Sequence, residues 1–456
     1  MKNKPGIPKG TRDFNSLQLY KRNYIIEIIK ANFLKFGFNP IETPSFERSS
    51  TLLGKYGDEG DRLIFKILKS GDFLKDLNNQ DLVDCNKGKI ASKISDKALR
   101  YDLTVPFARY VVQNQNEITL PFKRFQIQPV WRADRPQRGR FREFLQCDAD
   151  VIGSKSLYQE IELIQLFDSI FDSLMLNGTR IKINNRKILV GLSEILDCKD
   201  KFNDLTTALD KIDKIGIESV GQELESKGFS KKSINTIIEL INFSGDFRKA
   251  MALLKSIFKD SKIGLEGISD LEFIYSTIED LGLKSCSINF DLSLARGIDY
   301  YTGVIFEVSA PNTVSIGSIA GGGRYDNLTE IFGLSNMSGI GISFGLDRIY
   351  MVLDELNLFP VVEGSSVNVL FLNFGKENSL FSLDAISKLR ENNISTELYP
   401  DLLSLKKQLG YANKNNIPYV VFVGDDELND KKYNLKDMNS GSQELLTLTQ
   451  LVKKLS

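Results

Sequence analysis

The chain has 456 residues and carries 59 basic and 59 acidic side chains, so its formal net charge is zero. Bulk charge therefore gives no sign of a nucleic-acid partner, although local clusters of charge can still bind one. The sequence contains no histidine, which excludes Ser-His-Asp triads, Cys-His nucleophiles and histidine-ligated metals. Any catalysis has to rest on arginines, carboxylates, amides, hydroxyls and magnesium.

Apolar residues make up 42% of the chain, and a chain of this length holds about two or three domains. The four cysteines are widely spaced without a CxxC pair, so a zinc ribbon or redox dithiol is not expected. We recognise neither a membrane-length apolar run nor a secretory signal. The sequence thus predicts a cytoplasmic protein with no membrane partner.

Apolar spacing predicts a helix over residues 17–36, followed by an extended segment over residues 38–46 that two prolines interrupt. Residues 64–68 have the pattern of a short strand. The polar composition of residues 72–97 predicts a mobile connection.

Residues 98–112 are expected to begin extended and to become helical after Pro106. Two apolar-rich strands over residues 122–131 and 141–152 enclose the polar loop RADRPQRGR, which predicts an antiparallel hairpin with a long tip. A helix over residues 157–176 and a short strand at 181–184 follow.

Residues 189–281 are rich in Lys, Asp, Glu and Ser with helical periodicity, which indicates a helical insertion. Strand patterns resume at residue 288, and a helix is predicted over residues 346–356. Beyond a linker at residues 360–366, strands and helices alternate over residues 367–456. This alternation predicts a small α/β domain with a mostly parallel sheet.

The hairpin loop carries five arginines within eleven residues: Arg132, Arg135, Arg138, Arg140 and Arg142. Arginine presents a planar fork that suits phosphate and carboxylate oxygens. On a strand, Arg140 and Arg142 would face the same side. The alternative is a solvated loop with ordinary surface charges, and this segment alone does not decide between them.

Two further segments carry polar side chains at strand spacing. In ALRYDLTVPFARY, Asp102 and Thr104 share one face if the segment is extended, and together suit an ammonium group. The alternative is a turn or a helix cap, which both residue types favour. In FLQCDADVIG, Gln146, Asp148 and Asp150 line one face of a straight strand, which faces either solvent or a pocket.

The segment LARGIDYYTGVIFE places Arg296, Asp299, Tyr300 and Tyr301 in a strand-like apolar run, where buried polar groups need partners. In IAGGGRYDNL, three consecutive glycines before Arg324 let the backbone approach a ligand closely, with a cation beside it. Together these segments predict a pocket for a small polar molecule with an anionic end.

The stretch GIGISFGLDRIYMVLDEL is a glycine-rich strand that runs into a helix, with Arg348 near the start of the helix. The glycines would let a planar ligand lie against the backbone, and Arg348 could meet phosphate oxygens. Close packing of strands and a structural arginine remain the alternatives, because such a glycine pattern is weakly specific.

In their order along the chain and in their residues, these segments resemble histidyl-tRNA synthetases, which are class II aminoacyl-tRNA synthetases. The resemblance covers essentially the whole chain. GFNPIETPSFE resembles motif 1 of the class, RFQIQPVWRADRPQRGRFREFLQCDAD resembles motif 2, and GIGISFGLDR resembles motif 3. LARGIDYYTG and AGGGRYD resemble the two histidine-specific motifs.

The resemblance implies an α+β class II catalytic domain, in which helices flank an antiparallel sheet. It also implies a helical insertion and a C-terminal α/β anticodon-binding domain. The implied parts are a catalytic core at 1–188 and 282–359, the insertion at 189–281, a linker at 360–366 and the anticodon-binding domain at 367–456.

The resemblance further implies that a homodimer activates L-histidine with ATP to histidyl-adenylate. The histidine is then transferred to the 3′ end of tRNA(His). The implied Mg²⁺ bridges phosphates and keeps its waters, so no metal site built from the protein alone is expected. The lack of histidine side chains fits this chemistry, which positioning and charge neutralisation can carry.

By the same resemblance, Arg132 and Arg296 are catalytic and stabilise the α-phosphate. The phosphates of ATP are held by Arg132, Arg140, Arg142 and Arg348. Histidine is bound by Asp102, Leu103, Thr104, Arg132, Gln146, Asp150, Arg296, Tyr300 and Tyr301. The wall around its side chain consists of Gly321, Gly322, Gly323, Arg324 and Tyr325. The acceptor end of tRNA meets Gln137 and Arg138.

Two alternatives belong to other functional classes. One is a non-catalytic regulatory subunit or tRNA sensor that resembles the synthetase, although the arginines and both histidine-specific segments are intact here. The other is a class II synthetase for proline, threonine or glycine, against which LARGIDYYTG and AGGGRYD argue.

Overall fold

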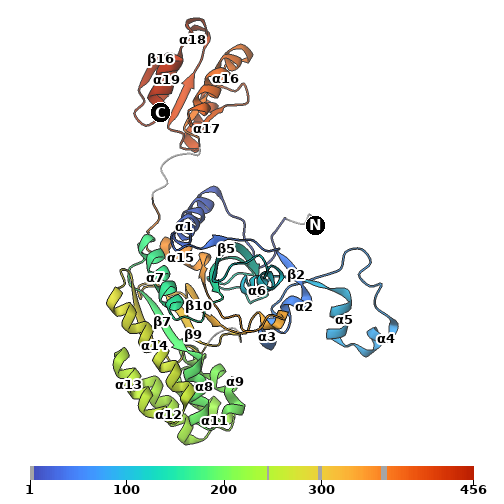
Figure 1. Ribbon diagram of the computed structural model, residues 1–456. Helices are drawn as coiled ribbons and strands as arrows, with labels where there is room; N and C mark the ends of the chain where they lie inside the picture. The colour runs from blue at the N-terminus through green and yellow to red at the C-terminus, as the bar shows by residue number, and fades with distance from the viewer. Residues whose placement is uncertain (1–4, 244–245, 296–299, 361–366) are drawn as a thin grey trace. The chain divides into compact units, whose positions relative to one another are not determined.

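The computed structural model describes residues 5–243, 246–295, 300–360 and 367–456. The chain divides into two compact units, Met1–Phe359 and Pro360–Ser456, and each unit buries an apolar core of its own (Figure 1). The division falls at the predicted linker, of which residues 361–366 lie outside the described residues. No helix in the described part of the chain has the length and apolar character needed to cross a membrane.

The described part of the first unit contains an eight-stranded sheet in the order β1-β5-β6-β11-β10-β9-β7-β8. The strands are β1 (Asn39–Pro40), β5 (Phe122–Trp131), β6 (Glu143–Ile152), β7 (Thr179–Asn185), β8 (Cys286–Phe290), β9 (Val304–Ser309), β10 (Ala320–Tyr325) and β11 (Gly339–Gly345). The outermost pairs, β1–β5 and β7–β8, are parallel, whereas the pairs between them are antiparallel. This confirms the predicted α+β class.

Helix α1 (Ser16–Lys35) contacts both α7 (Tyr158–Ser173) and α15 (Leu346–Glu355), and all three contact the middle of the sheet (Figure 1). Aromatic rings fill this contact. The ring of Phe344 on β11 lies 5.3 Å from that of Phe167 and 5.7 Å from that of Phe171, both on α7.

The alternation of side chains along β6 separates a core face from a polar face. Cys147, Ala149 and Val151 belong to the apolar core. Because side chains alternate along a strand, Gln146, Asp148 and Asp150 lie on the other face, where they are also buried. One face of this strand is therefore structural and the other is polar, buried and available for a site.

The segment after β7 is helical, as its composition predicted, and Figure 1 shows these helices gathered beside one end of the sheet. It contains α8 (Arg186–Ile195), η1 (Lys199–Lys201), α9 (Phe202–Leu209), α10 (Ile212–Ile215), α11 (Ile217–Ser226), α12 (Lys231–Asn242), α13 (Phe247–Ile257) and α14 (Lys262–Leu281). The helices begin three residues before the predicted start at 189.

The prediction of a mobile connection over residues 72–97 is wrong. The structure has α4 (Asn79–Asp84) and α5 (Lys87–Ile94) there, and Figure 1 shows both projecting from the sheet. Asn78 and Asp81 form a capping box at the start of α4, and the Asn86 side chain accepts from the Lys89 amide at 3.1 Å. Such caps stabilise short helices that lack an apolar stripe.

A smaller sheet in the order β2-β4-β3 holds this projection to the unit. Its strands are β2 (Phe46–Arg48), β3 (Lys66–Ile67) and β4 (Lys97–Leu99), and the short helices α2 (Ser49–Leu52) and α3 (Gly57–Arg62) lie between β2 and β3. Helix α6 (Thr104–Gln113) starts before Pro106, not after it as predicted. Proline is compatible with the first turn of a helix, so Pro106 did not mark the boundary.

The second unit has a five-stranded sheet in the order β13-β12-β14-β15-β16. Its elements are β12 (Val369–Phe371), α16 (Lys376–Glu391), β13 (Thr396–Leu398), α17 (Leu405–Lys414), β14 (Tyr419–Phe422), α18 (Asp425–Asp430), β15 (Tyr433–Asp437), β16 (Gln443–Leu446) and α19 (Leu448–Leu455). β13, β12 and β14 are parallel as predicted, whereas β15 and β16 join antiparallel, so the sheet is mixed.

Candidate active site

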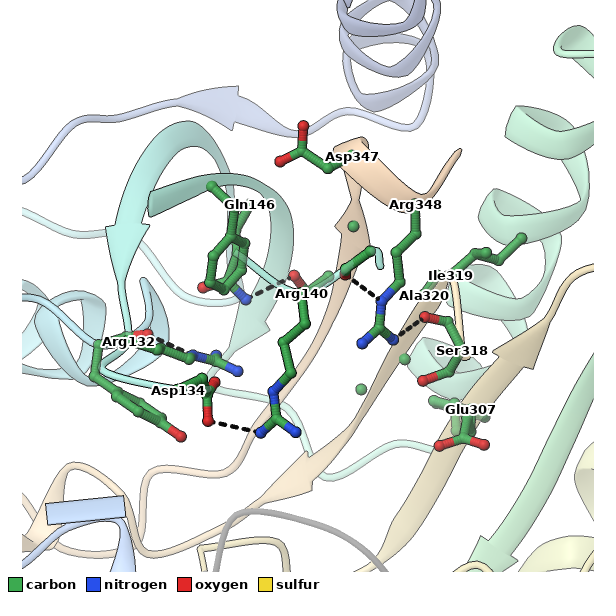
Figure 2. A pocket seen from close by; sticks show the side chains of 18 of the residues that line it. Arg132, Asp134, Arg140, Gln146, Glu307, Ser318, Ile319, Ala320, Asp347 and Arg348 are labelled. Atoms are coloured by element: carbon green, nitrogen blue, oxygen red, sulfur yellow. Dashed lines mark hydrogen bonds and ion pairs between the residues drawn. The ribbon is translucent and has the colours of Figure 1, made fainter. Parts of the chain in front are cut away.

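A cavity of about 540 Å³ opens on the polar face of the large sheet in the first unit (Figure 2). Strands β6, β9, β10 and β11 contribute to its lining, together with the arginine-rich loop and the start of α15. A volume of this size suits a small molecule or a nucleotide. Arginines surround one part of the cavity, and buried carboxylates lie behind another.

Arg132 follows directly after β5 and is held in place before any ligand binds. Its Nε donates to the Tyr101 carbonyl at 3.0 Å, and its guanidinium lies 4.3 Å from the centre of the Tyr101 ring. The Phe144 ring lies 5.3 Å away from the same guanidinium. A planar cation fixed through Nε keeps its terminal nitrogens oriented for an anion.

The arginine-rich loop closes around Asp134, which is buried. Arg140 lines the cavity and pairs with the Asp134 carboxylate at 2.7 Å. Arg142 does not line the cavity, and its Nε donates to the Asp134 backbone carbonyl at 3.1 Å. The two side chains therefore differ in environment, unlike the strand arrangement considered from the sequence, because β6 begins only at Glu143.

Arg348 approaches the cavity from the first turn of α15. Its Nε donates to the Gly139 carbonyl at 3.0 Å, and its Nη1 donates to the Ser318 carbonyl at 2.6 Å. Figure 2 shows the guanidinium groups of Arg132 and Arg140, from the hairpin loop, and of Arg348, from α15, pointing into the same space. The structure thus gathers three of the four arginines assigned to phosphates.

Asp102 lies before α6, buried behind the cavity wall. Its carboxylate accepts from the Tyr56 hydroxyl at 2.8 Å, from the Val105 amide at 3.1 Å and from the Tyr300 hydroxyl at 3.4 Å. It therefore bonds an amide in the first turn of the helix, although Leu103 is the N-cap residue, and it also accepts from two phenols. Thr104 begins α6 instead of sharing a strand face with Asp102, and Leu103 is fully buried between them. Burial raises the pKa of Asp102.

Asp150 is buried among charged and phenolic groups. One oxygen accepts from the Tyr325 hydroxyl at 2.7 Å, and the other pairs with Arg124 on β5 at 2.7 Å. Burial raises the pKa of Asp150, while the positive charge of Arg124 opposes the rise. The Arg124 pair compensates a charge that would otherwise be costly to bury.

Asp148 and Gln146 continue the polar row along β6. Burial raises the pKa of Asp148 to about 7. Gln146 lines the cavity, and its Nε2 donates to Ser343 Oγ on β11 at 3.0 Å. The buried Gln146 Oε1 and Asp148 Oδ1 have no hydrogen-bond partner among the described residues. Unpaired buried acceptors of this kind are costly unless a ligand or water meets them.

The glycines of β10 and β11 allow close packing around this row. Gly321 and Gly322 line the cavity, and a Cβ on Gly323 would lie 3.0 Å from the Tyr301 ring. A Cβ on Gly341 would overlap the Asp150 carboxylate. Close approach of side chain and backbone therefore requires glycine here.

Arg324 does not extend the cavity wall. Its guanidinium is buried and contacts both oxygens of Glu160, at 2.5 and 2.6 Å. Tyr325, the next residue, points instead toward Asp150. The cation expected beside the glycines is thus neutralised within the fold.

Tyr301 lines the cavity, and its ring centre lies 5.0 Å from that of Tyr300, edge to face. Burial raises the pKa of both phenols, so both stay protonated and able to donate. Both precede β9, so they lie outside a strand. Arg296 and Asp299, which were assigned from the same segment, lie outside the described residues.

Comparison with known proteins agrees with this arrangement. A family model described as Histidyl-tRNA synthetase matches residues 92–349. The histidine–tRNA ligase of Christiangramia forsetii is 58% identical over 451 residues, which cover 99% of each chain. The chain belongs to the histidyl-tRNA synthetase family. The histidine–tRNA ligase of Bacteroides fragilis is 52% identical over 99% of each chain.

Solved structures give the same result. A crystal structure of the histidyl-tRNA synthetase from a Nostoc species superposes with a TM-score of 0.78 at 28% identity, over 100% of this chain and 99% of that one. A second family model, described as Anticodon binding domain, matches residues 367–456.

Several residues of the site were not found from the sequence. Tyr56 holds the Asp102 carboxylate and Arg124 holds that of Asp150. Asp347 lines the cavity while it pairs with Arg12 at 2.6 Å and with Arg22. Only Arg124 had a usable signal, because it is a cation within an apolar strand and faces Asp150 in the hairpin register.

The residues expected at the tRNA end lie on the loop. Gln137 exchanges backbone hydrogen bonds with Arg140, at 3.1 and 2.9 Å. Arg138 is exposed and pairs with Glu355 at 2.5 Å. Exposed pairs of this kind are weak, so Arg138 could exchange its partner for a phosphate.

Proposed function

We propose that this chain is a histidine–tRNA ligase. It activates L-histidine with ATP to histidyl-adenylate and then transfers histidine to the 3′ end of tRNA(His). One observation carries the proposal: arginines converge on one side of a single cavity, and phenols line its other side with buried carboxylates behind them. Such a cavity suits a molecule that is anionic at one end and cationic at the other. Membership of the family supports the same activity.

The arginines would act on the phosphates. Arg132, fixed by Tyr101, would reach both the α-phosphate and the histidine carboxylate, with Arg296 as the second catalytic arginine. Arg140 and Arg348 would hold the outer phosphates. Arg142 has the weakest support, because the cavity lining does not include it. Fixed donors aimed at developing charge are effective in such reactions.

The carboxylates would select histidine. Asp102, Gln146 and the start of α6 at Leu103 and Thr104 would receive the ammonium. Asp150 and Tyr301 would meet the two imidazole nitrogens, supported by Tyr300 and Tyr325. A site with groups for both nitrogens rejects substrates that lack them by about 10⁴-fold.

No side chain has to carry a proton in the first step. A carboxylate oxygen of histidine attacks the α-phosphorus of ATP, the P–O bond to the leaving group breaks, and pyrophosphate departs with its charge held by arginines. In the second step a terminal ribose hydroxyl of tRNA attacks the carbonyl of the adenylate, the bond from that carbon to the phosphate oxygen breaks, and AMP leaves with the hydroxyl proton on its phosphate. Positioning and charge neutralisation would supply most of the acceleration.

Magnesium fits this cavity as an ion carried by the phosphates. The described residues contain no group of three or more Cys, Asp or Glu side chains that could hold a metal. Glu307 lines the cavity and would face the water shell of such an ion. When bound, the ion neutralises phosphate charge.

The proposed assembly and location rest on the resemblance to the same family. A homodimer that binds tRNA(His) through the loop at Gln137 and Arg138, working in the cytoplasm, stays part of the proposal. Light scattering of the purified protein tests the dimer, and a monomer at all concentrations would remove it.

Histidine-dependent charging of tRNA tests the proposed function. The purified protein should attach radiolabelled histidine to tRNA only when ATP is present. A regulatory subunit or tRNA sensor would bind tRNA or histidine without charging. Well-folded protein that fails to charge would therefore move that alternative ahead.

A further inference from the structure

The chain segment at residues 9–14, which precedes α1, lies against the arginine-rich loop. The Gly10 carbonyl accepts from the Arg142 amide at 2.8 Å, and Nη1 of Arg142 donates to the Lys9 carbonyl at 3.5 Å. Gly10 has a φ of +90°, and a Cβ there would lie 2.8 Å from Cγ of Arg142 and 3.0 Å from Cγ of Pro136. The segment and the loop are therefore packed so closely that position 10 requires glycine.

Arg12 in the same segment bridges the loop to helix α15. Its guanidinium lies 3.4 Å from the centre of the Phe141 ring in the loop, and its Nη2 pairs with Asp347 in the first turn of α15 at 2.6 Å. A cation that stacks on a ring while it donates to a carboxylate makes use of the planar fork of arginine. Phe141 and Asp347 line the cavity, whereas Arg12 is not among the described residues that do so. The bridge thus joins two parts of the cavity wall from outside the cavity.

The loop and α15 carry the two arginines to which we assign the outer phosphates of ATP. Arg140 directly precedes Phe141 in the loop, and Arg348 directly follows Asp347 in the helix. Each is thus one residue away from an anchor of the Arg12 bridge. Because like charges repel, the spacing of the two guanidinium groups depends on how firmly the loop and the helix are joined.

Other contacts between the loop and α15 use side chains that ligands would engage. Nε of Arg348 donates to the Gly139 carbonyl at 3.0 Å, and Arg138 pairs with Glu355 at 2.5 Å. The proposed function assigns Arg348 to phosphate and Arg138 to tRNA. The Arg12 bridge uses neither of these side chains, so it can persist while both ligands are bound.

We propose that Arg12 is a positioning residue, which joins the arginine-rich loop to α15 and thereby sets the spacing of Arg140 and Arg348 for the outer phosphates of ATP. The proposal rests on the proposed function, because that function supplies the nucleotide. Arg12 touches neither the nucleotide nor the reacting atoms. Its loss should therefore affect the binding of the outer phosphates more than the binding of the rest of the nucleotide.

ATP and AMP separate these two parts of the nucleotide, because AMP keeps the adenosine and the α-phosphate but lacks the outer phosphates. Calorimetric titration of the full-length protein, with magnesium present throughout, gives the dissociation constant of each. In Arg12→Ala the constant for ATP should rise about tenfold, since the preorganised spacing of the two arginines is lost, and that for AMP should change less than about twofold. Asp347 keeps its ion pair with Arg22 in this variant, so the fold should hold.

Two further variants supply a second test and a control. Gly10→Ala displaces the same segment without removing a charge, so it should weaken ATP and spare AMP as Arg12→Ala does. Lys21→Ala is the control, because Lys21 on α1 pairs with Asp354 on α15 at 2.5 Å and so ties the same helix to α1 instead of to the loop. This control should bind both nucleotides like the unaltered protein.

Unchanged ATP binding in Arg12→Ala, equal weakening of ATP and AMP, or the same loss of ATP binding in Lys21→Ala would overturn the inference alone. If the unaltered protein bound AMP as tightly as ATP and failed to charge tRNA with histidine, the proposed function would be refuted as well.

Discussion

The proposed role of Arg132 in activation depends on the planar shape of its guanidinium as much as on its charge. Nε is taken by the Tyr101 carbonyl and the plane lies over the Tyr101 ring, so only a planar fork can hold this position and still reach a substrate. Lysine would keep the charge but lose the anchor. Replacing Arg132 by lysine therefore tests whether activation of histidine needs the geometry of the guanidinium in addition to its charge.

Arg132→Lys should lower histidine-dependent ATP–pyrophosphate exchange by about 10²-fold or more, since a misplaced cation no longer meets the developing charge. Arg135→Lys is the matched control, because Arg135 is exposed on the same loop. Exchange is measured without tRNA, so the control should stay near the unaltered protein. An Arg132→Lys variant with ordinary exchange rates would contradict the proposed role.

Asp148 gives a prediction for stability against pH. Burial raises its folded pKa from the ordinary 3.8 to about 7, and the charged or titratable groups around it include Arg124, Asp150, Asp102, Arg100, Cys147 and Tyr301. The folded state therefore holds a proton that the unfolded state has lost. The contribution of Asp148 to the free energy of unfolding falls as pH rises from about 4 to about 7.

Asp148→Asn replaces the carboxyl by a neutral amide that does not titrate, so the variant should become more stable relative to the unaltered protein as pH rises from about 4 to about 7. Urea unfolding at several pH values measures the difference. A difference that does not change with pH would show that Asp148 is not protonated in the fold near neutrality.

At the scale of elements, glycine spacing on the paired strands β10 and β11 makes room for the polar row of β6. A Cβ at position 341 would overlap the carboxylate of Asp150, which Arg124 and Tyr325 hold from two other strands. The packing of strands and the recognition of a substrate are therefore coupled at this position.

Gly341→Ala should displace Asp150 and weaken histidine-dependent exchange by about one to two orders of magnitude. Gly221→Ala, on α11, is the control. The nearest atom to its added methyl would lie 3.6 Å away, on Ile234, and alanine favours a helix by up to about 1 kcal/mol. Loss of activity in both variants would point to a general effect of added methyl groups.

The sequence carried enough information for the elements whose periodicity is strong. The hairpin strands β5 and β6 and helix α15 lie within two residues of their predicted ends, because apolar alternation and spacing set them. The short helices α4 and α5 were missed, since Asn78 and Asn86 stabilise them by capping and not by an apolar stripe.

The site was predictable in its residue types and less so in its contacts. Alternation along β6 placed Gln146, Asp148 and Asp150 on one face, but the partners of that row come from other strands, β5, β10 and β11. The Arg324–Glu160 pair joins residues 164 positions apart, so no local pattern could have assigned that arginine to the core. The same holds for Tyr56, which reaches Asp102 from a different segment.

At the scale of the whole molecule, each of the two units has an apolar core of its own, as independent folding requires. The unit Pro360–Ser456 has its own core, which includes Val369, Phe371 and Val421, and the described residues that line the active-site cavity belong to the first unit. Folding of the first unit and activation of histidine should therefore not require the second.

Removal of residues 360–456 should leave histidine-dependent exchange within about threefold of the full chain but weaken charging of tRNA by at least about tenfold in kcat/KM, since recognition of the anticodon would be lost. Steady-state kinetics of both reactions on the same preparation measure the two effects. Unchanged charging kinetics in the shortened chain would contradict the assignment of an anticodon-binding role to residues 367–456.

The central claim is that the cavity activates histidine, and amino-acid-dependent ATP–pyrophosphate exchange tests it most directly. The assay is run in parallel with each of the standard amino acids under identical conditions. Our account predicts exchange with histidine alone, since only its imidazole satisfies both Asp150 and Tyr301. Exchange with another amino acid, or none from a folded protein that binds ATP, would contradict it.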